Sequence, residues 1–132
     1  MTEDLELLNV LYAKFCKNDE LMGLLGNPKT PKERVARIHR EITPLEYATE
    51  KNVNFISMYL SSATETDNIY VVRAFLNVDY YAASREQLAR MKSIVTEILR
   101  DMDIFCVSTY NVPSDTKGVY RYKQMFRPLI WS

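Results

Sequence analysis

The chain has 132 residues, of which 47% are hydrophobic and 26% are charged, a composition that excludes wholesale disorder and fits one globular domain. Its seventeen basic and seventeen acidic residues cancel, so no global field draws the chain to nucleic acid or to an anionic membrane. The three glycines leave no glycine-rich phosphate loop. The opening MTEDLELL is acidic where a secretory signal is basic, and no apolar run approaches a membrane span, so we expect a soluble protein made in a cytoplasm.

The N-terminal third predicts two helices. Apolar residues recur at three- and four-residue steps over residues 5–16 and predict an amphipathic helix. The segment LMGLLG, residues 21–26, holds two glycines suited to a left-handed helix terminus. The stretch TPKE, residues 30–33, has the spacing of a capping box with proline in the first turn, which predicts a short helix through Val35 and Ile38.

Two neighbouring strands are expected in the middle of the chain. Residues 53–60 (VNFISMYL) are rich in β-forming residues, and the polar residues 61–68 join them to a second β-forming run, so a hairpin is the simplest connection. In this second run, residues 70–80, apolar side chains fall on every second position, while Asn77 and Asp79 occupy the opposite set. The alternation predicts one buried face and one wetter face, as in an antiparallel sheet.

A capped helix and a second hairpin complete the domain. Residues 84–87 (SREQ) have capping-box spacing, and an apolar stripe over residues 88–102 predicts a helix that lies across the sheet. Residues 104–110 and 119–126 are two further strands, joined by a loop rich in turn-forming residues. The order of elements predicts a single α+β domain over residues 1–132: a small antiparallel sheet of about four strands, with a long helix packed on one face and an N-terminal helix.

Residues with catalytic potential are sparse. The single histidine, His39, has no second imidazole or cysteine nearby in the sequence, so we expect a surface role rather than a metal ligand or a general base. Asp101 and Asp103 flank a helix end but form no recognisable metal or acid–base pattern. Cys16 and Cys106 lie in apolar stretches without a CxxC pair, and we interpret both as reduced core residues. We therefore predict no catalytic, metal or cofactor site and no enzymatic activity.

Charge is segregated along the chain even though it sums to zero. Residues 29–40 hold five basic side chains against one acidic one, whereas the first twenty residues and residues 41–67 lean acidic. Patches of opposite sign favour head-to-tail contacts between copies, the arrangement that closes into rings. The other interpretation is that these segments are solvated faces. Arg121 and Lys123 share one strand face, and such a basic stripe can also meet phosphate.

The candidate interface residues come from these charged segments, from the middle strand and from the C-terminus. They are Arg34, Arg37, Arg40, Arg73, Asp79, Arg121, Lys123, Arg127 and Trp131. Trp131 is either a core or edge-strand residue or an interface anchor, since tryptophan and arginine are over-represented where partner surfaces become buried.

The stretches KNDELMGLLG, IYVVRAFLNVDYYA and SREQLARMKSIVTEILRDM, in this order, resemble the tail-terminator and tail-completion proteins of tailed bacteriophages. In that family a short helix ends in a similar Leu-Leu-Gly stretch, a long strand ends in an aromatic residue, and a helix packs on a small sheet before a closing hairpin. The matching positions are residues 24–26, Val78, Tyr80, Ser84 and the stripe 88–99. These are fold positions rather than a site, and the basic segment 29–42 departs from the family pattern.

The resemblance implies a structural virion protein that is assembled in the cytoplasm of a bacterial host and is located in the tail or neck. Its implied role is a homo-oligomeric ring, a hexamer, that caps the head-proximal end of the tail tube and joins it to the head connector. The implied partners are other copies of the chain, the tail tube protein and the head–tail connector protein, with DNA close by in the channel. Two alternatives stay open: another connector or tube component of the virion, or a cytosolic α+β binding module or small enzyme that uses the sheet face near Arg73 and Asp79.

Overall fold

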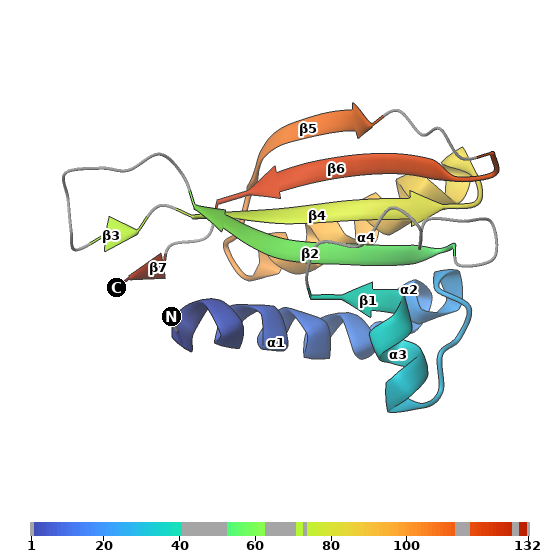
Figure 1. Cartoon of the computed structure of the whole chain (residues 1–132), viewed down its shortest axis with the longest axis horizontal. Helices are drawn as coiled ribbons and strands as arrows, with labels where there is room; N and C mark the ends of the chain where they lie inside the picture. The colour runs from blue at the N-terminus through green and yellow to red at the C-terminus, as the bar shows by residue number, and fades with distance from the viewer. Residues whose placement is uncertain are drawn as a thin grey trace.

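The computed structural model describes residues 2–40, 53–62, 71–72, 74–112, 117–127 and 130–131 of the chain. Its helices are α1 (Thr2–Cys16), α2 (Asp19–Leu24), α3 (Pro31–Arg37) and α4 (Arg85–Asp101). Its strands are β1 (Ile38–His39), β2 (Phe55–Ser62), β3 (Val71–Val72), β4 (Ala74–Ala82), β5 (Cys106–Val112), β6 (Tyr120–Phe126) and β7 (Ile130–Trp131). The fold has the predicted α+β class, with a sheet, a long helix and an N-terminal helix (Figure 1).

Five strands form the main sheet, in the order β1-β2-β4-β6-β5, where the sequence predicts about four. β2 and β4 pair antiparallel, as do β4 and β6, and β5 and β6. The additional strand, β1, makes the sheet mixed, because it pairs in parallel with β2 through Ile38↔Ile56 and His39↔Ser57. β3 and β7 form a separate antiparallel pair.

Two elements of the N-terminal region differ from the sequence-based prediction. The helix expected to run through Ile38 ends at Arg37, and Ile38 adopts an extended backbone with φ −129° and ψ 99°. Ile38 is fully buried where it pairs with β2, so tertiary pairing overrides the local helix preference. α2 was not predicted as a separate helix. It begins because the Asn18 side chain accepts a hydrogen bond from Leu21 N (2.9 Å) and caps the first turn.

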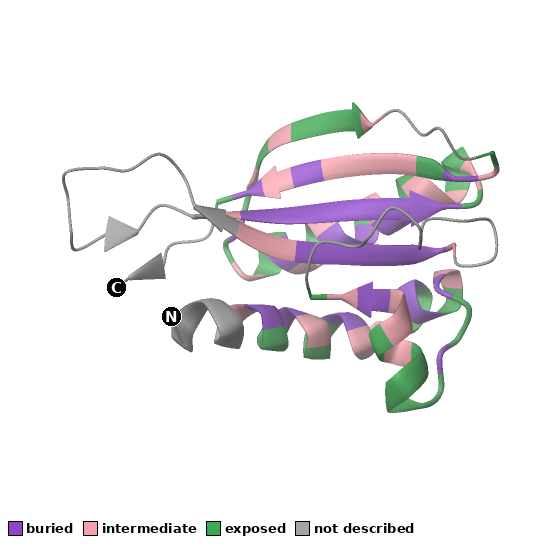
Figure 2. Cartoon of the chain, in the orientation of Figure 1, coloured by how far each residue is buried: buried purple, intermediate pink, exposed green. Residues whose placement is uncertain are grey.

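The main core lies between one face of the sheet and the helices α1, α2 and α4, and Figure 2 shows the buried strands at the centre of the molecule. The predicted stripe of α4 is confirmed, since Met91, Val95 and Leu99 are buried in this core. In β4 the predicted alternation is also confirmed for the core side, where its apolar residues are fully buried. The opposite face is not wet as expected, because Asn77 and Asp79 are only 1% and 9% exposed.

Helix ends follow the sequence signals closely. Thr30 and Glu33 form the predicted capping box, with the Thr30 hydroxyl accepting from Glu33 N at 3.2 Å. Gly26 ends α2 with φ +87°, and Asn27 N donates to Met22 O at 2.8 Å, which is the pattern of a left-handed C-terminal motif.

The predicted box at the start of α4 is only half formed. Ser84 accepts from Gln87 N at 3.2 Å, but the Gln87 side chain accepts instead from Asn54 Nδ2 at 3.1 Å. Within the described ranges, no helix combines the length and the apolar character needed to cross a membrane.

Candidate functional site

Two rows of side chains cross the sheet on the face opposite the main core, and they hold three of the candidate residues. In one row the strand register aligns Ser57, Asp79, Lys123 and Tyr110 across β2, β4, β6 and β5. The next row aligns Phe55, Tyr81, Arg121 and Val112. The structure therefore brings Asp79, Arg121 and Lys123 together on one face. The sequence analysis expected Arg121 and Lys123 to share a strand face, because they are two positions apart in one strand.

Asp79 is the buried charge of this face. Burial raises its pKa above the usual range, and the charges of Lys123 and Arg121 and a hydrogen bond with the Tyr59 side chain oppose the shift without cancelling it. Partial burial lowers the pKa of Lys123, but its hydrogen bond with Tyr59 and its electrostatic interactions with Tyr59 and Asp79 outweigh burial and raise the pKa overall. The charged groups of this cluster therefore interact with one another and with Tyr59, and the buried Asp79 offers little surface to a ligand.

Arg121 is likewise engaged within the chain. Its guanidinium lies 4.9 Å from the centre of the Tyr81 ring, and Nη2 donates to the Tyr81 hydroxyl at 3.1 Å. Tyr81 in turn stacks on Phe55 with ring centroids 4.3 Å apart. Burial raises the pKa of Tyr81, with the nearby Arg121 charge acting against it. Arg121 therefore closes an aromatic stack, with one of its N–H groups committed to the Tyr81 hydroxyl.

The basic segment around α3 holds the elements together as well as carrying charge. Arg37 Nη1 donates to the backbone oxygen of Asn54 at 3.1 Å. Arg40 Nη1 donates to Asn9 Oδ1 at 2.6 Å, and its guanidinium lies 4.4 Å from the centre of the Tyr12 ring. Of the three predicted arginines in this segment, Arg34 is the one for which the structure gives no such contact; it is half-buried on α3.

The remaining candidates are spread over the C-terminal part of the sheet and beyond it. Arg127 is exposed just after β6, with its guanidinium 5.9 Å from the centre of the Phe75 ring. Trp131 belongs to β7, where its backbone pairs with Val71 of β3. Arg73 lies outside the described residues.

The outer edge of β5 is the feature that the sequence analysis missed. β5 is the last strand of the sheet, and within the described part of the chain no further strand pairs with it. Phe105 immediately before it is 56% exposed, and Val107 and Tyr110 within it are 48% and 47% exposed. Natural sheet edges are commonly protected by charges or by another element, so an edge with exposed apolar side chains indicates a contact surface. The apolar run IFCVSTY was the available signal, but it does not show which strand lies at the edge.

The structure describes all the residues that the sequence analysis considered for catalysis or metal binding. Among the described residues no group of three histidine, cysteine, aspartate or glutamate side chains could hold a metal ion. His39 Nε2 is 3.0 Å from Ala36 O, and its ring packs edge-on against Phe55. Cys16 and Cys106 are free thiols that are half-buried against the main core, and Asp101 and Asp103 are exposed.

Comparison of the chain with models of known protein families and with curated proteins finds no match in either case. The geometry of this chain and the sequence patterns described above are therefore the observations that bear on its function.

Proposed function

We propose that this chain is a structural subunit of a tailed-phage virion, a ring-forming tail terminator that caps the head-proximal end of the tail tube and joins it to the head connector. The exposed apolar edge at β5 is the observation that carries the proposal. The α+β fold, with its capped α4 on a small sheet, agrees with what the family resemblance implies. Assembly with further copies, the tail tube protein and the connector protein follows from this role.

The two edges of the sheet differ in character, and this difference favours a head-to-tail contact. The β5 edge exposes Phe105 and Val107, and it follows the exposed Asp103 in the chain. At the opposite edge α3 precedes β1 (Figure 1) and exposes Val35, at 49%, beside the exposed Lys32. The β5 edge thus has Asp103 beside its apolar surface and the α3 edge has Lys32, while Arg127 next to Phe105 and Glu33 on α3 add a charge of the other sign at each edge. Unlike surfaces that meet repeatedly in this way generate a ring when the rotation closes.

Raising the salt concentration should weaken such a contact. Complementary exposed charges steer the edges together and are screened as ionic strength rises. The apolar side chains supply most of the binding free energy, roughly 25 cal/mol for each Å² of apolar surface that becomes buried. We therefore expect assembly to weaken at high salt without being abolished by it.

Three exposed valines provide a matched test. Val107 lies on the β5 edge, Val35 lies on α3 at the other edge, and Val10 lies on α1; they are 48%, 49% and 45% exposed. Each is replaced by glutamate, and the mass of each variant is measured by light scattering. The proposal expects Val107→Glu and Val35→Glu to prevent ring formation and Val10→Glu to leave it unchanged.

Mixing the two disrupted variants distinguishes a head-to-tail contact from a symmetric one. The intact β5 edge of Val35→Glu fits the intact α3 edge of Val107→Glu, so the mixture forms a dimer and nothing larger. A symmetric contact between two β5 edges gives no dimer in the mixture beyond what Val35→Glu forms alone. Rings that survive both substitutions would overturn the proposal.

Another connector or tube component of the same virion uses the same surfaces, and the position of the protein in intact particles separates it from a terminator. Labelling at the head-proximal end of the tail tube supports the terminator role, and labelling along the tube supports a tube component. The binding-module alternative gains little from Asp79, because this carboxyl is only 9% exposed.

A further inference from the structure

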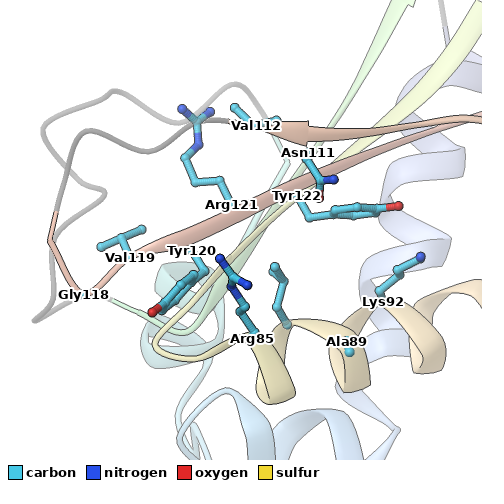
Figure 3. Close-up of a pocket in the computed structure, with 11 residues that line it drawn as sticks. Arg85, Ala89, Lys92, Asn111, Val112, Gly118, Val119, Tyr120, Arg121 and Tyr122 are labelled. Carbon is cyan, nitrogen blue, oxygen red and sulfur yellow. The ribbon is translucent and has the colours of Figure 1, made fainter.

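A trench separates the first half of α4 from the ends of β5 and β6. It has a volume of about 750 Å³ and is lined by side chains that include Arg85, Lys92, Asn111, Tyr120 and Tyr122. Figure 3 shows the Arg85 side chain beside Tyr120 and the Lys92 side chain near Tyr122, with both pairs facing the trench. The proposed ring contact at the β5 edge does not use this trench.

Each cation of α4 is held over a tyrosine of β6. The Arg85 guanidinium lies 5.8 Å from the centre of the Tyr120 ring, and Lys92 Nζ lies 4.6 Å from the centre of the Tyr122 ring. A ring face restricts a cation without neutralising it, so its N–H groups stay available to an anion. No acidic side chain is among the described residues that line the trench. The one ion pair between described residues joins Arg90 and Glu20 on another face of α4.

The spacing of the two cations constrains the ligand. Arg85 and Lys92 are seven residues apart on one helix, which corresponds to about 10 Å along its axis. An extended peptide advances about 3.3 Å per residue, so acidic side chains two to four positions apart reach both cations. Leu88 lies between them on the helix and adds apolar surface to the trench. We propose that the trench binds an extended acidic segment of a partner protein, with its carboxylates on Arg85 and Lys92.

Nucleic acid fits this trench less well than an acidic peptide. Single-strand binding combines a long basic track with aromatic faces on which bases stack, and here a cation already lies over one face of each tyrosine. The formal net charge of the chain is zero, so little additional attraction for phosphates is available. The β5 residues Asn111 and Val112 border the trench on the side of the sheet.

The test uses the full chain and a fluorescein-labelled peptide of alternating glutamate and threonine, which places carboxylates on one face. A peptide with glutamine in place of glutamate is the control ligand, and fluorescence anisotropy measures binding. Arg85→Gln and Lys92→Gln remove the two cations singly. Arg100→Gln is the matched control, because Arg100 is an exposed residue of α4 that does not line the trench.

The proposal expects saturable binding of the glutamate peptide, at least tenfold weaker binding of the glutamine peptide, and at least tenfold weaker binding by each of the Arg85 and Lys92 variants. Arg100→Gln binds as the unmodified chain does. Equal losses in all three variants would show non-specific charge attraction and would overturn the proposal. Tighter binding of a thymidine oligonucleotide through the same two cations would overturn the choice of a peptide. Self-association that both variants abolish would identify a second copy as the occupant instead.

Discussion

Asn54 is the residue whose loss we expect to be most costly relative to its size. Its side chain is 7% exposed and joins three elements. Nδ2 donates to Leu24 O at 2.8 Å and to Gln87 Oε1 at 3.1 Å, and Oδ1 accepts from Ala83 N at 2.7 Å. Asn54 therefore links the end of α2 to the start of α4 and to the turn before it, while its side chain leaves almost no surface to water.

Replacing Asn54 by alanine removes these three hydrogen bonds. A typical intramolecular hydrogen bond contributes about 1 kcal/mol net, and a donor or acceptor left unpaired in a buried position costs more. We therefore expect Asn54→Ala to lower the free energy of unfolding by about 3 kcal/mol. That is a large part of the roughly 5–15 kcal/mol that stabilises a domain of this size.

Equilibrium unfolding in urea measures this loss directly. Asn54→Ala should shift the midpoint to lower urea with an unchanged m-value, because the surface exposed on unfolding is nearly the same. Asn111→Ala is the matched control, since Asn111 is an exposed asparagine on β5, and it should change the free energy by less than about 0.5 kcal/mol. A loss at Asn54 no larger than that at Asn111 would refute the role of Asn54 as a link between elements.

Three further substitutions test separate parts of the fold. Tyr80→Phe removes the buried hydrogen bond from the Tyr80 hydroxyl to Gln124 Oε1 (2.6 Å) and should cost about 1–2 kcal/mol, whereas Tyr110→Phe at an exposed site should cost almost nothing in the same urea assay. Burial raises the pKa of Asp79 above its unfolded value, so its stabilising contribution is complete below the unfolded pKa and is lost as pH rises through the folded pKa. The unfolding free energy of the unmodified chain relative to Asp79→Asn should therefore fall as pH rises from below the usual aspartate pKa, about 4, through the raised folded pKa, and a rise over this range would contradict the assignment. Ser84→Ala removes the side-chain cap of α4 and should lower thermal stability by about 1 kcal/mol, while an unchanged melting temperature would show that the cap contributes nothing.

Local signals in the sequence predicted the parts of the fold that depend on neighbours along the chain. The Thr30 and Ser84 caps, the Gly26 terminus and the α4 stripe all involve contacts within a few residues. β1 could not be predicted in this way, because Ile38 becomes a strand residue only through its pairing with Ile56. The buried state of Asp79 was missed for a related reason, since alternation shows which side chains share a face but not whether that face is covered.

The candidate site was predicted less well than the fold, because its character depends on strand order and long-range contacts. Arg37 and Arg40 were predicted as interface candidates or as part of a solvated face, but their side chains reach Asn54 and Asn9, which are 17 and 31 residues away. Phe105 belongs to a run predicted only as a strand, and its exposure follows from the place of β5 at the end of the sheet order. A sequence pattern does not give strand order, so the contact edge could be recognised only from the structure.

The most direct test of the proposed ring is the mass of the unmodified protein, measured by light scattering over a concentration series at low and at high salt. The proposal predicts a closed oligomer of about six subunits. Raising the salt concentration should increase the protein concentration that is needed to keep this oligomer assembled, because screening weakens the attraction between its edges. A protein that stays monomeric at every concentration and both salt levels, or a mass that grows without limit, would contradict a self-closing ring built from the β5 and α3 edges.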